Sequence, residues 1–192
     1  VLVSGVGALV VLYAHYYLAP EDATPTFYSR LLVFAAAMIG VAISGNLLLL
    51  VVFWELTSLA SYLLIAHWSD RSDARAGARM SLAITAGGGL ALLGGVLLIG
   101  AVVGSFELDQ VLVAGDQLRA DPRYPWILGL VLLGAFTKSA QFPFHFWLPQ
   151  AMAAPTPVSA FLHSATMVKA GVFLLARLYP ALSGTPEWLY LV

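Results

Sequence analysis

Cysteine is absent from this 192-residue chain, and charged residues make up only 10% of it. The absence of cysteine excludes disulfides and thiolate-bound metals and leaves the redox compartment open. Soluble domains carry about 25% charged residues, whereas this chain is 60% hydrophobic with a mean hydropathy of +0.88. These values predict an all-α polytopic membrane protein. A net charge of −1 argues against a nucleic-acid partner.

The chain also lacks an initiator methionine and a basic N-terminal segment, so a signal peptide is not expected. Its first residues already lie in an apolar run, and its last residues, Trp188–Val192, begin another. We therefore expect residues 1–192 to form a single transmembrane domain that is a fragment of a longer protein.

Apolar runs of about 20 residues, the length that crosses a bilayer core, recur along the chain. We expect about six transmembrane helices plus the start of a seventh. The expected spans are 1–18, 27–44, 47–66, 76–103, 126–153 with an interruption, and 158–179, the last of them stopped by Pro180. The polar stretch Pro20–Thr26 is expected to be a loop, and Ser105–Pro125 to hold a short surface helix over Glu107–Leu118.

Two spacings in and before the expected span 76–103 carry further predictions. Small residues recur at every fourth position and predict a ridge for close helix packing; they are Ala83, Gly87, Ala91 and Gly95. Arginines 71, 75 and 79 share one face if the helix begins early. Four Lys or Arg residues lie on the side of this arginine-bearing loop and three on the other, which weakly places the loop in the cytoplasm.

The stretch Phe136–Arg177 is apolar, yet it carries four Lys or His side chains and four of the ten prolines. Ionisable groups inside a bilayer cost about 2.5–3.5 kcal/mol each on insertion scales. Prolines interrupt helices, and a broken helix is tolerated in lipid only inside protein or beside a wet cavity. We therefore predict one discontinuous helix, broken near Lys138–Pro143 with Pro143 and Pro149 at the break, on a cation or proton path.

Glu55 and Lys138 are the two strongest candidates for that path. Glu55 lies near the middle of an expected span, where it either pairs with a membrane lysine and tunes its proton affinity or forms a structural ion pair. Lys138 lies at the expected break. A buried lysine holds its proton less firmly and a nearby carboxylate restores it, so a lysine with a movable partner is a proton switch. Alternatively, Lys138 only satisfies free carbonyls at the break.

Three further residues are candidate relay groups. His145 follows Pro143 by two residues and either relays protons or binds a freed carbonyl. His163 can exchange protons near neutral pH, although a lone helical histidine is more often a packing residue. Lys169 follows His163 by six residues and so faces a different direction on the same helix. It either extends the relay or points into a neighbouring protein of the same assembly.

Other chemistry is not indicated by the sequence. His15 and His67 lie at span ends, where an interfacial role is favoured. No His, Asp or Glu residues have metal-site spacing on one helix face, and no hydrolase arrangement is present. We expect no metal and no cofactor.

Three blocks of this sequence resemble one known family. They are WELTSLASYLLI, KSAQFPFHFWLPQAM and APTPVSAFLHSATMVKAGVFLLAR. They are similar to the proton-translocating antiporter-like membrane subunits, which include large chains of NADH–quinone oxidoreductase (complex I), of membrane-bound hydrogenases and of Mrp-type multisubunit cation/proton antiporters. The resemblance implies that Glu55 pairs with Lys138 on a discontinuous helix and that His163 continues the path. It also implies a second, inverted repeat C-terminal to these residues.

The resemblance favours the Mrp branch. Complex I chains usually carry Arg-Val-Gly-Asp in the helix after the W-E-L span, whereas this chain has Ala86-Gly87-Gly88-Gly89 there. The segment GARMSLAITAGGGLALLGG resembles the large Mrp antiporter protein of the A type. The implied function is a proton-translocating part of a monovalent cation/proton antiporter in the plasma membrane, with other membrane subunits as partners. Two alternatives remain: a proton-pumping component of complex I or a hydrogenase, and a structural component that conducts nothing.

Overall fold

The computed structural model describes residues 2–19, 22 and 24–192, and the regular structure among them is helical apart from one isolated β-bridge between Asn46 and Glu107. In chain order the elements are α1 (Leu2–Tyr17), α2 (Thr24–Ile43), α3 (Leu47–Ile65), α4 (Ser72–Val103), α5 (Leu108–Val113), α6 (Gly115–Ala120), α7 (Tyr124–Lys138), the 3₁₀ helix η1 (Phe144–Phe146), α8 (Trp147–Ala151), α9 (Thr156–Ser159), the π-helix η2 (Ala160–Thr166), α10 (Met167–Leu182) and α11 (Pro186–Leu191).

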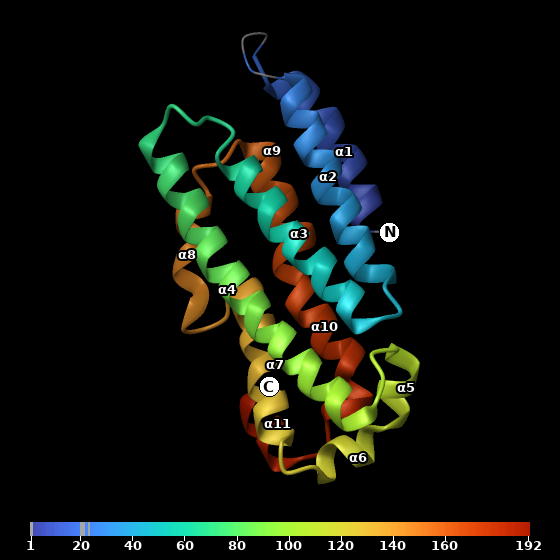
Figure 1. Ribbon diagram of the computed structural model, residues 1–192. Helices are drawn as coiled ribbons and strands as arrows, with labels where there is room; N and C mark the ends of the chain where they lie inside the picture. Colours follow the sequence, from blue (N-terminus) through green and yellow to red (C-terminus); the bar gives the residue numbers. More distant parts are fainter. Residues whose placement is uncertain (1, 20–21, 23) are drawn as a thin grey trace.

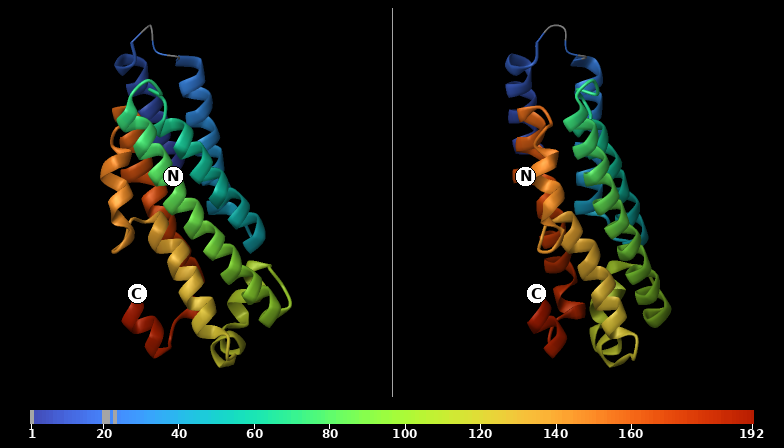
Figure 2. Two further views of the ribbon diagram at one scale, coloured as in Figure 1. Left: turned by 60° about the vertical axis from the view of Figure 1, so that its left-hand side comes forward. Right: turned by 90° about the vertical axis from the view of Figure 1, so that its left-hand side faces the viewer.

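The long helices run side by side along the length of the molecule, and α5, α6 and α11 gather at one end (Figure 1). Figure 2 shows the same elongated bundle from two further sides. Helix α4 packs against α3 and also against α7 and α8, while α10 packs against α7. The core therefore lies where α3, α4, α7 and α10 meet.

Four segments are long and apolar enough to cross a membrane: α2, α3, α4 and the continuous helical run Thr156–Leu182. Helices α1 and α7 are apolar but shorter. The all-α membrane class predicted from composition is confirmed at this level. Apolar side chains also cover much of the outside of these helices, as expected where lipid is the solvent; Leu32, Val52 and Leu90 are examples.

Local sequence explains where α3 and α4 begin and end. Asn46 caps α3, because its Oδ1 accepts hydrogen bonds from the backbone N–H groups of Leu48 and Leu49 at 2.9 and 3.3 Å. Helix α4 begins at Ser72, earlier than the predicted 76, so Arg75 and Arg79 do lie in its first turns. It ends at Gly104, whose φ of +80° suits glycine.

Three sequence-based boundaries need correction. Pro180 does not stop its helix, because α10 continues to Leu182 and the Ser183 N–H still bonds the Tyr179 carbonyl at 2.9 Å; a proline so near the end removes only one backbone donor. The surface helix predicted at Glu107–Leu118 is two short helices, α5 and α6, which meet at Ala114. Helix α2 begins at Thr24, three residues before the predicted start. The rest of the predicted loop Pro20–Thr26 lies partly outside the described residues, since Pro20, Glu21 and Ala23 are not among them.

The small-residue ridge predicted on α4 is on the wrong face. Ala83 and Gly87 are exposed, and a Cβ on Gly87 would meet nothing within 4 Å. The close approaches are made instead by Gly77 to the Gln150 backbone and by Gly88 to the Thr137 side chain. The partners decide the face, because α4 is enclosed by three other elements and its glycines are needed where those come closest.

Candidate functional site

The centre of the site is the point where α7 ends. Helix α7 stops at Lys138, Ala140 takes a positive φ of 50°, and helical structure resumes at η1 and α8. Pro143 lies at the N-terminal cap of η1, as predicted for a residue at the break. Pro149 lies within the short α8, where a missing N–H has no helical partner to lose. The chain is therefore interrupted between Lys138 and Phe144, beside the buried core.

Lys138 is fully buried, and its ammonium is held by α3. Its Nζ donates to the Trp54 carbonyl oxygen at 2.9 Å and to Ser58 Oγ at 2.7 Å. It also lies 5.2 Å from the centre of the Trp54 ring, a cation–π distance. One charged side chain thus has three favourable contacts from a single helix, which is what a buried cation requires.

Glu55 lies next to Trp54 in the sequence but does not ion-pair directly with Lys138. The three ion pairs among the described residues lie elsewhere, and Glu55 Oε1 is buried without a hydrogen-bond partner in that same part of the chain. Its carboxylate lies against Gly89 of α4, where a Cβ would overlap Oε1. The two residues of the expected pair are therefore neighbours in the core, each held by a different part of α3 and α4.

Trp147 connects the end of α7 to His163. This fully buried indole donates from Nε1 to the Thr137 carbonyl oxygen at 2.9 Å, and its ring centre lies 5.9 Å from that of His163. Sequence reasoning did not single out Trp147. A tryptophan directly after the proline-bearing break, in an apolar stretch, was the available signal, because a buried indole N–H needs an acceptor and a helix end supplies one.

His163 lies in the π-helix η2, and neither ring nitrogen has a hydrogen-bond partner among the described residues. Hydroxyl groups support this widened turn: Thr166 Oγ1 donates to the Phe161 carbonyl oxygen at 2.6 Å, and Ser164 Oγ donates to that of Ala160. A π-helix displaces the residues it contains relative to a regular helix and is frequent at functional sites. The imidazole is consequently turned toward Trp147 and the core.

The other two candidates lie outside this core. His145 is exposed, and its ring stacks on Phe142 at 6.0 Å. Lys169 is exposed on α10, beside α1 and α2. The structure therefore brings together Glu55, Lys138 and His163 and separates His145 and Lys169 from them.

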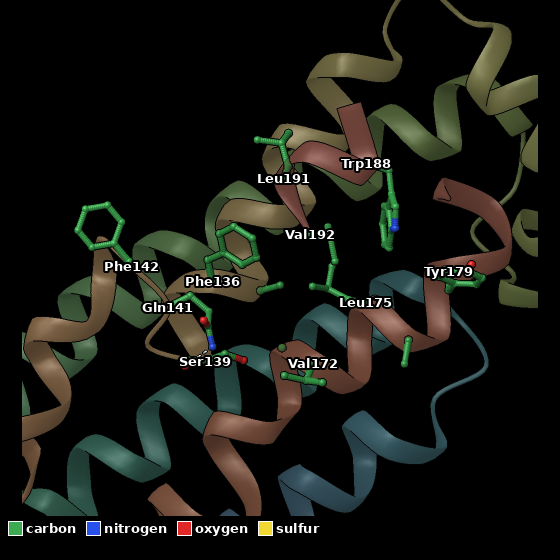
Figure 3. Close-up of a pocket in the computed structure, with 13 residues that line it drawn as sticks. Phe136, Ser139, Gln141, Phe142, Val172, Leu175, Tyr179, Trp188, Leu191 and Val192 are labelled. Carbon is green, nitrogen blue, oxygen red and sulfur yellow. Dashed lines mark hydrogen bonds between the residues drawn. The ribbon is translucent and has the colours of Figure 1, made fainter. Parts of the chain in front are cut away.

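A cavity of about 610 Å³ opens beside the interruption, between α7, α10 and α11. Figure 3 shows its apolar walls, with Ser139 and Gln141 as polar groups close to the end of α7. Ser139 Oγ is buried and has no hydrogen-bond partner among the described residues. Gly171 lets α10 approach closely, because a Cβ there would collide with the Ala135 carbonyl and Ser139 Oγ. The cavity provides room for water next to the broken helix.

Two titratable groups outside the membrane spans have shifted pKa values. Burial against Phe27, whose ring centre is 5.2 Å away, lowers the pKa of His67, and the nearby Arg30 charge lowers it further. The Arg123 guanidinium hydrogen-bonds Asp121 and lowers the pKa of that exposed carboxyl to about 2. Within the described residues no group of three His, Cys, Asp or Glu side chains could hold a metal ion.

Comparison with known proteins agrees with this geometry. The family described as "NADH:quinone oxidoreductase/Mrp antiporter, TM" matches residues 44–192, which include Lys138, Glu55 and His163. The chain belongs to this family. The resemblance inferred from the three sequence blocks is thereby confirmed.

Relatives within the NADH:quinone oxidoreductase/Mrp antiporter family are similar over the whole chain. A probable K(+)/H(+) antiporter protein of the A/B type from Rhizobium meliloti (strain 1021) is 61% identical, with 100% of this chain and 19% of the relative covered. A Na(+)/H(+) antiporter protein of the A type from Alkalihalophilus pseudofirmus is 52% identical, with 100% and 24% covered. A chain of the Mrp complex from Dietzia sp. DQ12-45-1b superposes with a TM-score of 0.92 at 41% identity, covering 99% of this chain and 21% of that one. The chain spans about a fifth to a quarter of these relatives' length.

Proposed function

We propose that this chain is part of a proton-translocating subunit of an Mrp-type monovalent cation/proton antiporter in the plasma membrane. The observation that carries the proposal is Lys138, a fully buried cation at the end of an interrupted helix, beside the Glu55 carboxylate and the His163 imidazole, which both have buried polar atoms. Ionisable groups at such depth are costly and indicate ion pathways. The similarity to antiporter proteins of the A type supports the Mrp branch.

The finer architecture belongs to the same proposal. We propose six transmembrane helices and the start of a seventh: α1, α2, α3, α4, the interrupted α7–α8 and the run Thr156–Leu182, followed by α11. The relatives are several times longer, which supports a fragment of a larger protein. The partners would be the other membrane subunits of an antiporter complex, and the end that bears Arg71, Arg75 and Arg79 would face the cytoplasm.

The proposed mechanism uses Lys138 as the central proton carrier. The Trp54 carbonyl and Ser58 Oγ hold its ammonium form, and the Glu55 carboxylate adds favourable charge nearby. Displacement of Glu55 would weaken the hold on the proton, which then leaves toward His163. Because Trp147 lies next to His163 and an indole N–H cannot accept a proton, that transfer needs water. His145 and Lys169, which lie outside the core, would serve only as outer relay groups.

The test measures proton flux in vesicles that contain the full-length complex. Addition of Na⁺, K⁺ or Li⁺ should change the internal pH, and Lys138→Ala should abolish that response with the yield of complex unchanged. Lys138→Arg is the matched control, because arginine keeps the charge but does not release its proton in proteins. Loss of flux in both variants supports a relay, whereas normal flux in Lys138→Arg would contradict it and favour a structural cation.

A redox-driven pump is the second candidate, since the family description names NADH:quinone oxidoreductase as well. Its structural support is a chain of the membrane-bound sulfane sulfur reductase, which superposes with a TM-score of 0.86 at 24% identity and so shows a shared fold. In the vesicle experiment, proton movement only on addition of an electron donor, with no response to cations, would favour this candidate over the antiporter.

A further inference from the structure

Lys169 is an exposed cation in the middle of a membrane span. It lies thirteen residues from each end of the helical run Thr156–Leu182, and its side chain is exposed on α10. The ion pairs of the described residues do not include it. It therefore differs from Lys138, which is fully buried and held by a carbonyl and a hydroxyl.

The depth of Lys169 excludes two common ways of accommodating a membrane lysine. At 1.5 Å per residue, thirteen residues place it about 20 Å along the helix from either end, and a bilayer core is about 30 Å thick. Its side chain is too short to snorkel from the centre to the interface. For the same reason a lipid head group cannot reach it, and lipid tails offer the ammonium no partner.

Lys169 lies in a groove between α1, α2 and α10 of about 350 Å³. The walls are mostly apolar, with Met38 and Val41 from α2 and Phe173 from α10, and Lys169 is the one charged residue among the lining residues. The hydroxyl of Thr166, which also lines the groove, is already bonded to the Phe161 carbonyl oxygen. The groove thus has an apolar surface for packing and a single cation that needs an anion.

We propose that this groove is docked by a transmembrane helix that carries a carboxylate at the depth of Lys169. Its apolar side chains would cover the groove, and its Asp or Glu would pair with the ammonium. Charge complementarity identifies the occupant: an apolar helix or a lipid tail would fill the groove but leave a cation without a counter-charge at the costliest depth. The inference requires only that the chain spans a membrane, and it holds whether or not Lys138 carries protons.

A photo-crosslinking experiment on the full-length protein in its native membrane complex identifies the occupant. Phe173, one turn after Lys169 and on the groove wall, is replaced by p-benzoylphenylalanine, which keeps the aromatic ring. After illumination, mass spectrometry should find a crosslinked peptide from a transmembrane segment with Asp or Glu in its central third. Crosslinks only to lipid, or to a segment without an acidic residue there, would overturn the proposal.

A charge exchange tests the ion pair itself. Lys169→Glu should lower both the crosslink and the yield of intact complex at least fivefold, because two carboxylates would then face each other. Lys169→Arg, the matched control, should keep both within twofold of wild type. Changing the identified Asp or Glu to Lys in the Lys169→Glu background should restore both, and failure to restore them would overturn the pairing. Neither readout involves proton flux, so the proposed transport function is tested separately.

Discussion

At the scale of single residues, the site is built by giving buried polar groups few alternatives. Lys138 depends on one carbonyl oxygen and one hydroxyl, both from α3. Trp147 depends on the single carbonyl of Thr137, which the end of α7 leaves free. Because unsatisfied polar groups are costly in an apolar core, small side chains such as Ser58 decide where the cation lies.

Replacement of Ser58 by alanine is expected to reduce cation-driven proton flux about tenfold, since hydrogen bonds to charged groups contribute about 1.5–3 kcal/mol. Ser61→Ala is the matched control, because Ser61 is also buried on α3 but donates to the Ser58 carbonyl and not to Lys138. Flux is measured in vesicles with equal amounts of complex. Equal flux in the two variants would remove Ser58 from the site.

His67 predicts a pH dependence of stability outside the spans. Its pKa is lowered by burial, so below about pH 6.5, its ordinary value, the unfolded chain binds a proton that the folded chain does not yet bind. The free energy of unfolding should therefore fall as pH drops from 6.5 toward the lowered pKa, and level off below it.

The measurement is the melting temperature of the solubilised complex at pH 7.5 and 5.5. Wild type should lose more between the two values than His67→Phe, which keeps an aromatic ring beside Phe27 but cannot titrate. An equal loss in both proteins would show that His67 does not contribute.

At the scale of the elements, α4 decides how closely α3 and α7 approach each other. Gly88 faces Thr137 of α7, and Gly89 faces Glu55 of α3, so two successive glycines serve two different neighbours. Gly87, one residue earlier, faces open space. The run of three glycines thus contains one position that tolerates a side chain and two that do not.

Gly89→Ala is expected to destabilise the protein by about 1–3 kcal/mol, because a methyl group would overlap the Glu55 carboxylate and force a shift. Gly87→Ala should be neutral or stabilising by up to about 1 kcal/mol, since alanine is the better helix former. Thermal unfolding of the solubilised complex compares the two. A Gly89→Ala protein as stable as Gly87→Ala would show that Glu55 has room to move there.

At the scale of the whole molecule, arginine side chains join helix ends that are far apart in the sequence. Arg119 of α6 donates to the carbonyl oxygens of Pro180, Ala181 and Ser183 at 3.1, 3.1 and 3.3 Å. Arg177 reaches the Ala42 carbonyl at the end of α2 at 3.2 Å. These carbonyls have no helical partner, so each arginine satisfies one helix end while it fixes another element.

Arg119→Met is expected to lower the free energy of unfolding by about 1–3 kcal/mol, because carbonyls at the end of α10 lose their donor. Arg123→Met is the matched control: its pair with Asp121 is at the surface, where such pairs contribute about 0–1 kcal/mol. Melting temperatures of the two variants provide the comparison. Equal losses would mean that Arg119 does not hold α10.

Much of the site was predictable because membrane depth limits what a sequence can mean. Composition alone predicts apolar helices, and Lys138 and Glu55 stand out because charge is rare in such helices. Pro143 marks the interruption, since proline cannot continue a helix. The pairing of Glu55 with Lys138, and the relay through His163, remain predictions.

What the sequence determined by itself is therefore the class of protein, the family, and which polar residues enter the membrane. Only the tertiary structure decided which of them meet. Spacing along one helix does not say which face another helix covers, so the face of α4 that packs closely was predicted wrongly. Trp147 enters the site, and His145 and Lys169 leave it, through contacts between elements far apart in the chain. Such contacts depend on how whole helices pack, which local sequence does not encode.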